Sequence, residues 1–245
     1  MKKSLLGLST AFILAMPLGL QAESWCDIEC AQENHELALL SKEVYHDTEV
    51  VGNWKRIADY KKDTLGYTHG LHLSVYSNLK NSKVAIVIEG TESTDMEDIV
   101  TDVVQLAGTP IVPKEYTEAR EFVEELREDN ATLKTAMLAG HSLGGGIAQY
   151  VGCSFGMETH TFNSAGLSDA TIEDAQEYYE EHEEDNVKQP ILNLISNNND
   201  GQRDIVSSFG TLLGEEKFVF VDKDNLIDLH AIAYIHEGLV NLIDE

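Results

Sequence analysis

Apolar and polar residues alternate in blocks along the chain, and these blocks predict strands and helices in turn. Val84–Ile88 is a continuous apolar run after a polar turn at 78–83, and Thr135–Ala139 is a second such run. Continuous apolar runs of this length are typical of strands buried on both faces of a sheet. Residues 71–75 instead alternate apolar with polar side chains, which predicts a half-exposed strand.

Three longer segments predict helices: residues 27–45, the acidic amphipathic segment 114–129, and the apolar segment 142–155. Shorter strands are predicted at 158–163, 190–196 and 216–222. Strands that alternate with helices predict an α/β fold with a mainly parallel central sheet flanked by helices. No internal repeat or long linker interrupts the pattern, so we expect residues 23–245 to form a single domain.

The first 22 residues differ from the rest and predict a signal peptide. Lys2 and Lys3 form a positive start, Leu5–Leu20 is an apolar stretch, and the small Ala22 offers a cleavage point. This stretch is too short and wrongly flanked for a good membrane anchor, although an uncleaved anchor is the alternative. We therefore expect export to the periplasm or to the extracellular space.

The chain is strongly acidic, with 43 Asp and Glu residues, 17 Lys and Arg residues and a formal net charge of −26 at pH 7. Such a charge repels nucleic acid and anionic membrane surfaces, so we exclude nucleic-acid binding. Any contact with a lipid interface must then be apolar. In an exported protein Cys26 and Cys30 could pair, although an i,i+4 pair in a regular helix is near the geometric limit. Cys153 would remain a buried free thiol.

Two features could suggest a metal site, and neither has the required pattern. The acidic run Glu173–Asn186 lacks the alternating ligands and the turn glycine of a calcium loop, so it predicts a solvated helix face. His69 and His72 lack further ligands nearby in the sequence. We expect neither a metal ion nor a cofactor.

The segment AGHSLGGG at 139–146 carries the strongest chemical signal, Gly-x-Ser-x-Gly between a predicted strand and a predicted helix. In this arrangement a sharp turn lifts the serine hydroxyl above the sheet edge, and the glycines let the backbones approach closely. Ser142 is therefore the candidate nucleophile. The amide of Leu143, at a helix N-terminus, is a candidate oxyanion-hole donor. The alternative is a Gly-rich turn with an idle serine.

A serine nucleophile needs a histidine base, and the base needs an acid that orients it. Four histidines follow Ser142: His160 lies in a predicted strand and His182 in the acidic run, which leaves His230 and His236. We favour His230 as the base. It opens the final helix, and a histidine in a loop entering a helix can reach over the sheet edge.

The orienting acid is expected after the strand at 190–196, because catalytic residues collect in loops at strand ends. Asp200 and Asp204 both follow this strand, and Ile205-Val206 can anchor Asp204. The later aspartates at 222, 224 and 228 are more typical of surface charge or helix capping.

These motifs resemble the class 3 lipase family, the fungal-lipase type, and its lipase-like bacterial relatives, over residues 34–240. GHSLGGG at 140–146 matches the family's serine turn, and 84–103 is similar to its strand, Gly-Thr oxyanion turn and following helix. In this resemblance Thr91 matches the second oxyanion-hole residue. Arg203–Val206 matches the segment of the catalytic acid, and His230 matches the final histidine.

Two positions depart from the family pattern: Glu89 stands where the family has Arg, and Ser207 stands where it has Pro. The resemblance implies an α/β-hydrolase fold and hydrolysis of acyl-lipid esters through a Ser142–His230–Asp204 triad and an acyl-enzyme. It also implies a mobile lid near residues 93–112, whose apolar side chains could equally pack in the core. The alternatives are a phospholipid-specific esterase or toxin-like effector, and a catalytically silent binding protein with a hydrolase fold.

Overall fold

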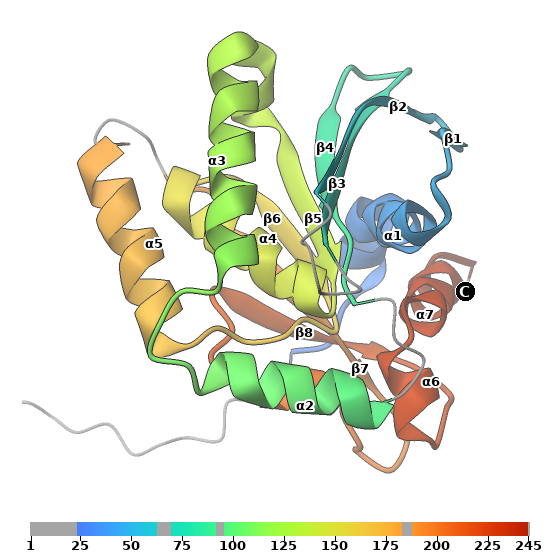
Figure 1. Cartoon of the computed structure of the whole chain (residues 1–245). Helices are drawn as coiled ribbons and strands as arrows, with labels where there is room; N and C mark the ends of the chain where they lie inside the picture. Colours follow the sequence, from blue (N-terminus) through green and yellow to red (C-terminus); the bar gives the residue numbers. More distant parts are fainter. Residues whose placement is uncertain (1–23, 63–69, 92–95, 183–187, 245) are drawn as a thin grey trace, which may run out of the picture.

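The computed structural model describes residues 24–62, 70–91, 96–182 and 188–244, so the predicted signal peptide lies outside the described residues. Within them eight strands form one sheet, ordered as in the chain (Figure 1). The strands are β1 (Val50–Val51), β2 (Trp54–Lys62), β3 (Leu71–Asn78), β4 (Val84–Ile88), β5 (Met137–His141), β6 (Thr159–Phe162), β7 (Ile191–Asn197) and β8 (Glu215–Phe220). Neighbours from β1 to β4 pair antiparallel, and neighbours from β4 to β8 pair parallel.

Helices cover both faces of this sheet. They are α1 (Ile28–Glu43), α2 (Met96–Ala107), α3 (Lys114–Asp129), α4 (Leu143–Phe155), α5 (Asp169–His182), α6 (Leu226–His230) and α7 (Ile232–Asp244), with short 3-10 turns η1 (Val44–His46), η2 (Ala131–Thr135) and η3 (Val206–Ser208). In Figure 1, α3, α4 and α5 lie on one side of the sheet, and α1 and α7 on the other. The predicted class, a mainly parallel sheet flanked by helices, is confirmed. No described helix is long and apolar enough to cross a membrane.

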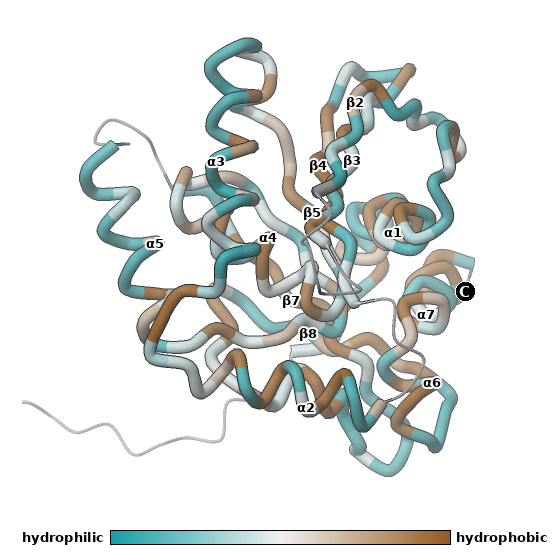
Figure 2. The backbone as a smooth tube through the Cα atoms, in the orientation of Figure 1, coloured by the Kyte–Doolittle hydropathy of each residue, from teal (hydrophilic) through white to brown (hydrophobic). Residues whose placement is uncertain are grey.

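The alternation of side chains along the central strands creates two cores. Successive residues of a strand point to opposite faces. Ile86 and Ile88 of β4 therefore pack with α3 and α4, whereas Ala85 and Val87 pack with α1 and α7. All four are fully buried, which explains why this strand is an unbroken apolar run. Figure 2 shows the contrast with α5, which is mostly hydrophilic and borders solvent.

The predicted helix at 114–129 coincides with α3, and the acidic run forms part of α5, with residues 183–187 outside the described part. The strand predicted at Thr135–Ala139 begins two residues later, because Ala131–Thr135 form η2. β2 was not predicted, since its charged residues conceal the strand period. Its pairing with β3 stabilises it, across a register shift between Arg56 and Ala58.

Cys26 and Cys30 form a disulfide, with Cα atoms 5.4 Å apart. Cys26 precedes α1, and Asp27 caps the helix in an extended backbone conformation, accepting a hydrogen bond from the Cys30 amide. The pair is therefore not confined by a regular helix, which removes the geometric obstacle. Cys153 in α4 is a free, partly buried thiol.

Candidate active site

Ser142 sits on the sharp turn between β5 and α4. β5 ends at His141 and α4 begins at Leu143, which leaves Ser142 alone at the junction with φ 57° and ψ −127°. Non-glycine residues rarely adopt positive φ, and such strain concentrates at functional sites. The turn is tight enough that a Cβ on Gly140 would collide with the backbone of Gly144. The spacing of the glycines therefore follows from close backbone approach.

Ser142, His230 and Asp204 form one hydrogen-bonded series. His230 Nε2 lies 2.9 Å from Ser142 Oγ, and His230 Nδ1 lies 2.8 Å from Asp204 Oδ1. The three residues are 2%, 4% and 0% exposed, so water screens these contacts little. Such a series is the geometry that lets a histidine accept the proton of a serine hydroxyl.

The environment of Asp204 stabilises its charged form. Burial alone would raise the pKa of this carboxyl. The charge of His230 and hydrogen bonds from His230 and Ser207 outweigh burial and lower the pKa below its usual value. An ionised Asp204 can only accept a hydrogen bond, so His230 Nδ1 carries the hydrogen. His230 Nε2 then presents its lone pair to Ser142.

Leu143 and Thr91 are the two residues predicted to donate to an oxyanion. Leu143 is the first residue of α4, where backbone N–H groups have no acceptor within the helix. Thr91 follows β4 and lines the pocket beside His230. The amide of Gly90, the residue before Thr91, is already used: it donates to Tyr45 Oη at 3.0 Å.

A pocket of about 490 Å³ opens beside this series. Its wall contains His230 together with Tyr45, Thr91, Met96, Ile99 and Ile232. Most of this lining is apolar, which suits a hydrocarbon chain. Among the described residues that line the pocket, none carries a carboxylate, whereas the lining does include Lys42 and His46.

The other histidines considered as bases lie elsewhere. His160 in β6 contacts Asn34 and Glu158, and His182 ends α5 with Nδ1 against a backbone carbonyl. His236 is part of α7, half-buried, and burial together with the nearby positive charges lowers its pKa. The structure brings only His230 among these four to Ser142. One detail differs from prediction: His230 ends the short helix α6 instead of opening α7.

The alternative acids also lie apart from His230. Asp200 is an exposed residue of the turn after β7, and its amide donates to Asn198. Asp228 accepts a hydrogen bond from the side-chain amide of Asn225. Asp204 instead lies where the loop returns to the sheet, its own amide donating to the Ser196 carbonyl of β7.

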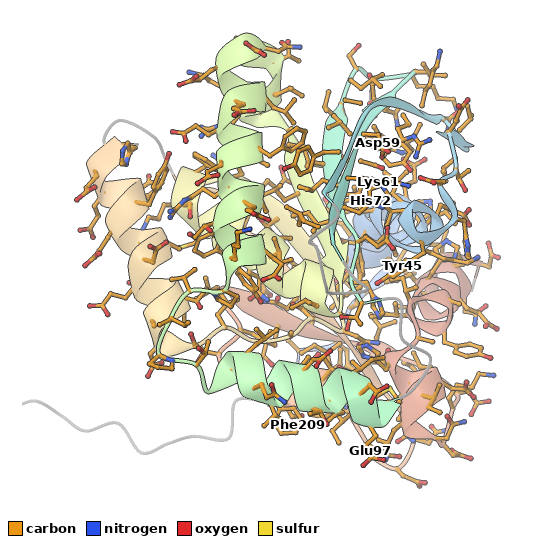
Figure 3. The ribbon with its side chains drawn as sticks, viewed as in Figure 1. Tyr45, Asp59, Lys61, His72, Glu97 and Phe209 are labelled. Atoms are coloured by element: carbon orange, nitrogen blue, oxygen red, sulfur yellow. A yellow bond between two sulfur atoms is a disulfide. The ribbon has the colours of Figure 1, made fainter. Side chains whose placement is uncertain are left out.

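His72 lies at the centre of a polar cluster near the end of β4. Its Nε2 is 2.9 Å from Asp59 Oδ1, and its Nδ1 contacts the Glu89 carboxylate. Figure 3 shows Asp59, Lys61 and His72 on the β2–β3 hairpin. Asp47 has a ligand atom near those of Asp59 and His72, but its two oxygens already accept from Lys61 at 2.7 and 2.6 Å. His69, the other half of the pair considered as a metal site, lies outside the described residues.

The segment at 93–112, where a lid is expected, divides between core and surface. Residues 92–95 lie outside the described part. Ile99 and Val103 of α2 pack against Ala165 and Val206, whereas Val104 is 44% exposed. In Figure 1, α2 lies along the lower edge of the molecule, with its N-terminal end beside α6. One face of α2 therefore belongs to the core and the other is available for contacts.

Sequence reasoning missed two side chains that contact the site. Tyr45, in η1, bonds both His141 and Gly90 and carries no local motif. Ser207 bonds Asp204 twice, and its only signal was its departure from the proline of the resembling family.

The family model of a Tle-like phospholipase domain matches residues 36–200 of this chain. The extracellular phospholipase A1 of Serratia liquefaciens is 32% identical over 149 residues, which cover 57% of this chain. The same alignment spans 44% of that relative, so the chain matches less than half of its length.

Two solved structures are similar in fold. A triacylglycerol lipase from Penicillium expansum has a TM-score of 0.52 at 12% identity, covering 85% of this chain and 84% of the lipase. A fungal lipase in an inhibitor complex has a TM-score of 0.51 at 14% identity, covering 80% and 81%. At such identities the likeness shows the fold alone, which is that of the α/β-hydrolases, as predicted.

Proposed function

This chain belongs to the family of Tle-like phospholipase domains, and on that premise we propose that it is a serine hydrolase that cleaves a carboxylic ester of a phospholipid. Ser142 is the nucleophile, His230 the base and Asp204 the acid that orients it. The observation that carries the proposal is the continuous hydrogen-bonded series Ser142–His230–Asp204 at the wall of an apolar pocket.

The reaction proceeds in two halves. His230 Nε2 takes the proton of Ser142 Oγ, which attacks the ester carbonyl to form a tetrahedral intermediate. The amides of Leu143 and Thr91 donate to its oxyanion. His230 then gives its proton to the leaving alcohol, the lysophospholipid, and the acyl group stays on Ser142. Water, deprotonated by His230, attacks this acyl-enzyme and releases the fatty acid and the free serine.

Two features favour a phospholipid over a neutral glyceride as substrate. The family model describes a phospholipase domain, and the Serratia relative is named a phospholipase A1. The lining of the pocket also departs from the charge of the whole chain, since its described residues include Lys42 and no carboxylate, within a protein of net charge −26. A cationic group beside the ester is suited to the phosphate of the headgroup.

The site of action is part of the proposal. The Serratia relative is named an extracellular enzyme, and the first 22 residues have the composition of a signal peptide. A disulfide between Cys26 and Cys30 is in keeping with an oxidising compartment. We infer export, followed by contact with a lipid surface through the outer face of α2, where Val104 is exposed.

The experiment compares the protein with Ser142→Ala on p-nitrophenyl esters of increasing chain length and on phosphatidylcholine. We expect turnover of both substrate types and a loss of roughly 10³-fold or more in the variant. Ser154→Ala is the matched control, because Ser154 is also buried in this region, on α4, and bonds only its own helix at Tyr150 O.

A silent binding protein predicts a different result. Such a protein would turn over none of the substrates and would leave Ser142 unlabelled by a serine-directed phosphonate. Full activity in Ser142→Ala would also refute the assignment of the nucleophile.

A further inference from the structure

Tyr45 and His141 connect four backbone segments around Ser142, those of Tyr45, Gly90, His141 and His230. Tyr45 Oη lies 3.1 Å from His141 Nδ1 and 3.0 Å from the Gly90 amide nitrogen. His141 Nε2 lies 2.8 Å from the backbone carbonyl oxygen of His230. The contacts span 96 residues between Tyr45 and His141 and 89 between His141 and His230. Figure 3 places Tyr45 beneath the β2–β3 hairpin, between α1 and the centre of the sheet.

The acceptors and donors determine the direction of every hydrogen bond in this connection. The His230 carbonyl can only accept, so His141 Nε2 carries the hydrogen. In a neutral imidazole the other nitrogen is then an acceptor, so Tyr45 Oη donates to His141 Nδ1. The oxygen of Tyr45 retains a lone pair, and the Gly90 amide donates to it. Each donor in the series therefore meets one acceptor.

His141 remains neutral over the pH range in which the site can work. Burial, with a smaller contribution from the charge of His230, lowers the pKa of His141 to about 3. A protonated His141 would present two donors and would reverse the bond to Tyr45. Because the pKa is so low, the direction of the series is constant from mildly acidic to alkaline pH.

The contact of Tyr45 with Gly90 is tight. A Cβ on Gly90 would lie 2.6 Å from Tyr45 Oη, 2.6 Å from the His141 carbonyl oxygen and 3.3 Å from Ser142 Cβ. The turn after β4 thus packs directly against the serine turn. Thr91, whose amide we assign to the oxyanion hole, is the next residue along.

We propose that Tyr45 and His141 are positioning residues, which hold the Gly90–Thr91 turn against Ser142 so that the Thr91 and Leu143 amides face the same point. This inference rests on the proposed function. Since the amide of Gly90 donates to Tyr45, it cannot also donate to the oxyanion, and the Thr91 amide takes that role. The same series holds the backbone of His230 in place through His141.

The first test is Tyr45→Phe, which removes a single oxygen. We expect kcat on a short p-nitrophenyl ester to fall about 10- to 100-fold with KM unchanged, because a displaced oxyanion donor costs that much. Tyr76→Phe is the matched control: Tyr76 is fully buried in the same core, and its hydroxyl donates to Thr48 O, away from the site. A Tyr45→Phe enzyme with the kcat of the control would overturn the proposal.

The second test measures coupling. His141→Phe keeps a ring at this position but removes both the donor to the His230 carbonyl and the acceptor for Tyr45. If the two residues act as one series, the kcat loss of the double variant with Tyr45→Phe should be clearly smaller than the product of the two single losses. Losses that multiply would show that the residues act separately and would contradict the series.

A third readout is independent of turnover. Hydrogen exchange of the Gly90 amide should be slow in the protein and in Tyr76→Phe, and at least roughly tenfold faster in Tyr45→Phe, since the hydrogen bond is lost. If the protein has no ester activity, the proposed function fails, while this measurement still decides whether Tyr45 holds the turn. Unchanged exchange in Tyr45→Phe would refute it.

Discussion

Ser207 donates two hydrogen bonds to the same carboxylate oxygen of Asp204, one from its backbone N–H and one from its hydroxyl, each 2.8 Å long. The opposite oxygen of Asp204 accepts from His230. The resembling lipases have proline at this position, and proline offers neither donor. The substitution therefore adds donors to the buried acid, and both donors favour its ionised form.

Removal of the Ser207 hydroxyl should weaken the site and the fold together. In Ser207→Ala we expect a free energy of unfolding lower by about 1.5–3 kcal/mol at pH 7, the usual value of a hydrogen bond to a charged group. The pKa of Asp204 is depressed in the folded state. Its contribution to stability is therefore present above the unfolded pKa of about 4 and is lost as pH falls through the folded pKa. Urea denaturation should show a difference between variant and parent that shrinks below about pH 4.

The neighbouring Ser208→Ala serves as control, because the Ser208 hydroxyl bonds the backbone carbonyl of Asp204 and not its carboxylate. A constant difference at all pH values would mean that Ser207 acts without regard to the charge of Asp204.

The stability of the β2–β3 hairpin should depend on the charge of His72. Burial lowers the pKa of His72, but hydrogen bonds with Glu89 and Asp59 outweigh burial and raise it above its ordinary value. A raised folded pKa gives a contribution that is complete below the unfolded pKa of about 6.5 and is lost as pH rises through the folded pKa. His72→Gln should therefore destabilise the protein more at pH 5.5 than at pH 9, measured by urea denaturation. An equal effect of His72→Gln at both pH values would contradict the prediction.

Lys42 should matter for phospholipids and not for simple esters. In Lys42→Met we expect KM for a dispersed short-chain phosphatidylcholine to rise roughly five- to tenfold, since a charge-assisted contact to phosphate is lost. KM for p-nitrophenyl butyrate, which has no phosphate, should be unchanged. Lys188→Met is the control, because Lys188 lies over the Tyr179 ring, away from the pocket. An equal rise of KM for both substrates would indicate a general effect on the pocket.

The exposed face of α2 should be needed on lipid surfaces. Val104→Glu places a charge on a 44% exposed apolar position. We expect hydrolysis of phosphatidylcholine vesicles to fall roughly tenfold while hydrolysis of a soluble short ester is retained, because burying a charge in the interface is costly. Leu79→Glu alters a leucine in the β3–β4 turn that is more exposed, at 68%, and should be neutral. If both variants retain vesicle hydrolysis, α2 does not contact the lipid surface.

Local sequence was enough to predict the features that depend only on residues close together in the chain. The serine turn depends on glycines four residues apart, Gly140 and Gly144, around a residue with positive φ, and it was predicted from seven letters. The helix at 114–129 and the strand at 84–88 were predicted for the same reason, since each carries its own period of burial. β2 escaped prediction because its stability comes from pairing with β3 and not from its own pattern.

The sequence by itself determined the class of the fold, and it indicated Ser142 as the candidate nucleophile with His230 and Asp204 as the favoured partners. Only the tertiary structure shows that His230 Nε2 lies 2.9 Å from Ser142 Oγ and His230 Nδ1 lies 2.8 Å from Asp204 Oδ1. It also revealed Tyr45, which lies 96 residues from the histidine that it bonds. The physical reason is that a turn or a strand period is encoded among neighbours in the chain, whereas a hydrogen bond between distant segments exists only after the sheet has brought its strand ends together.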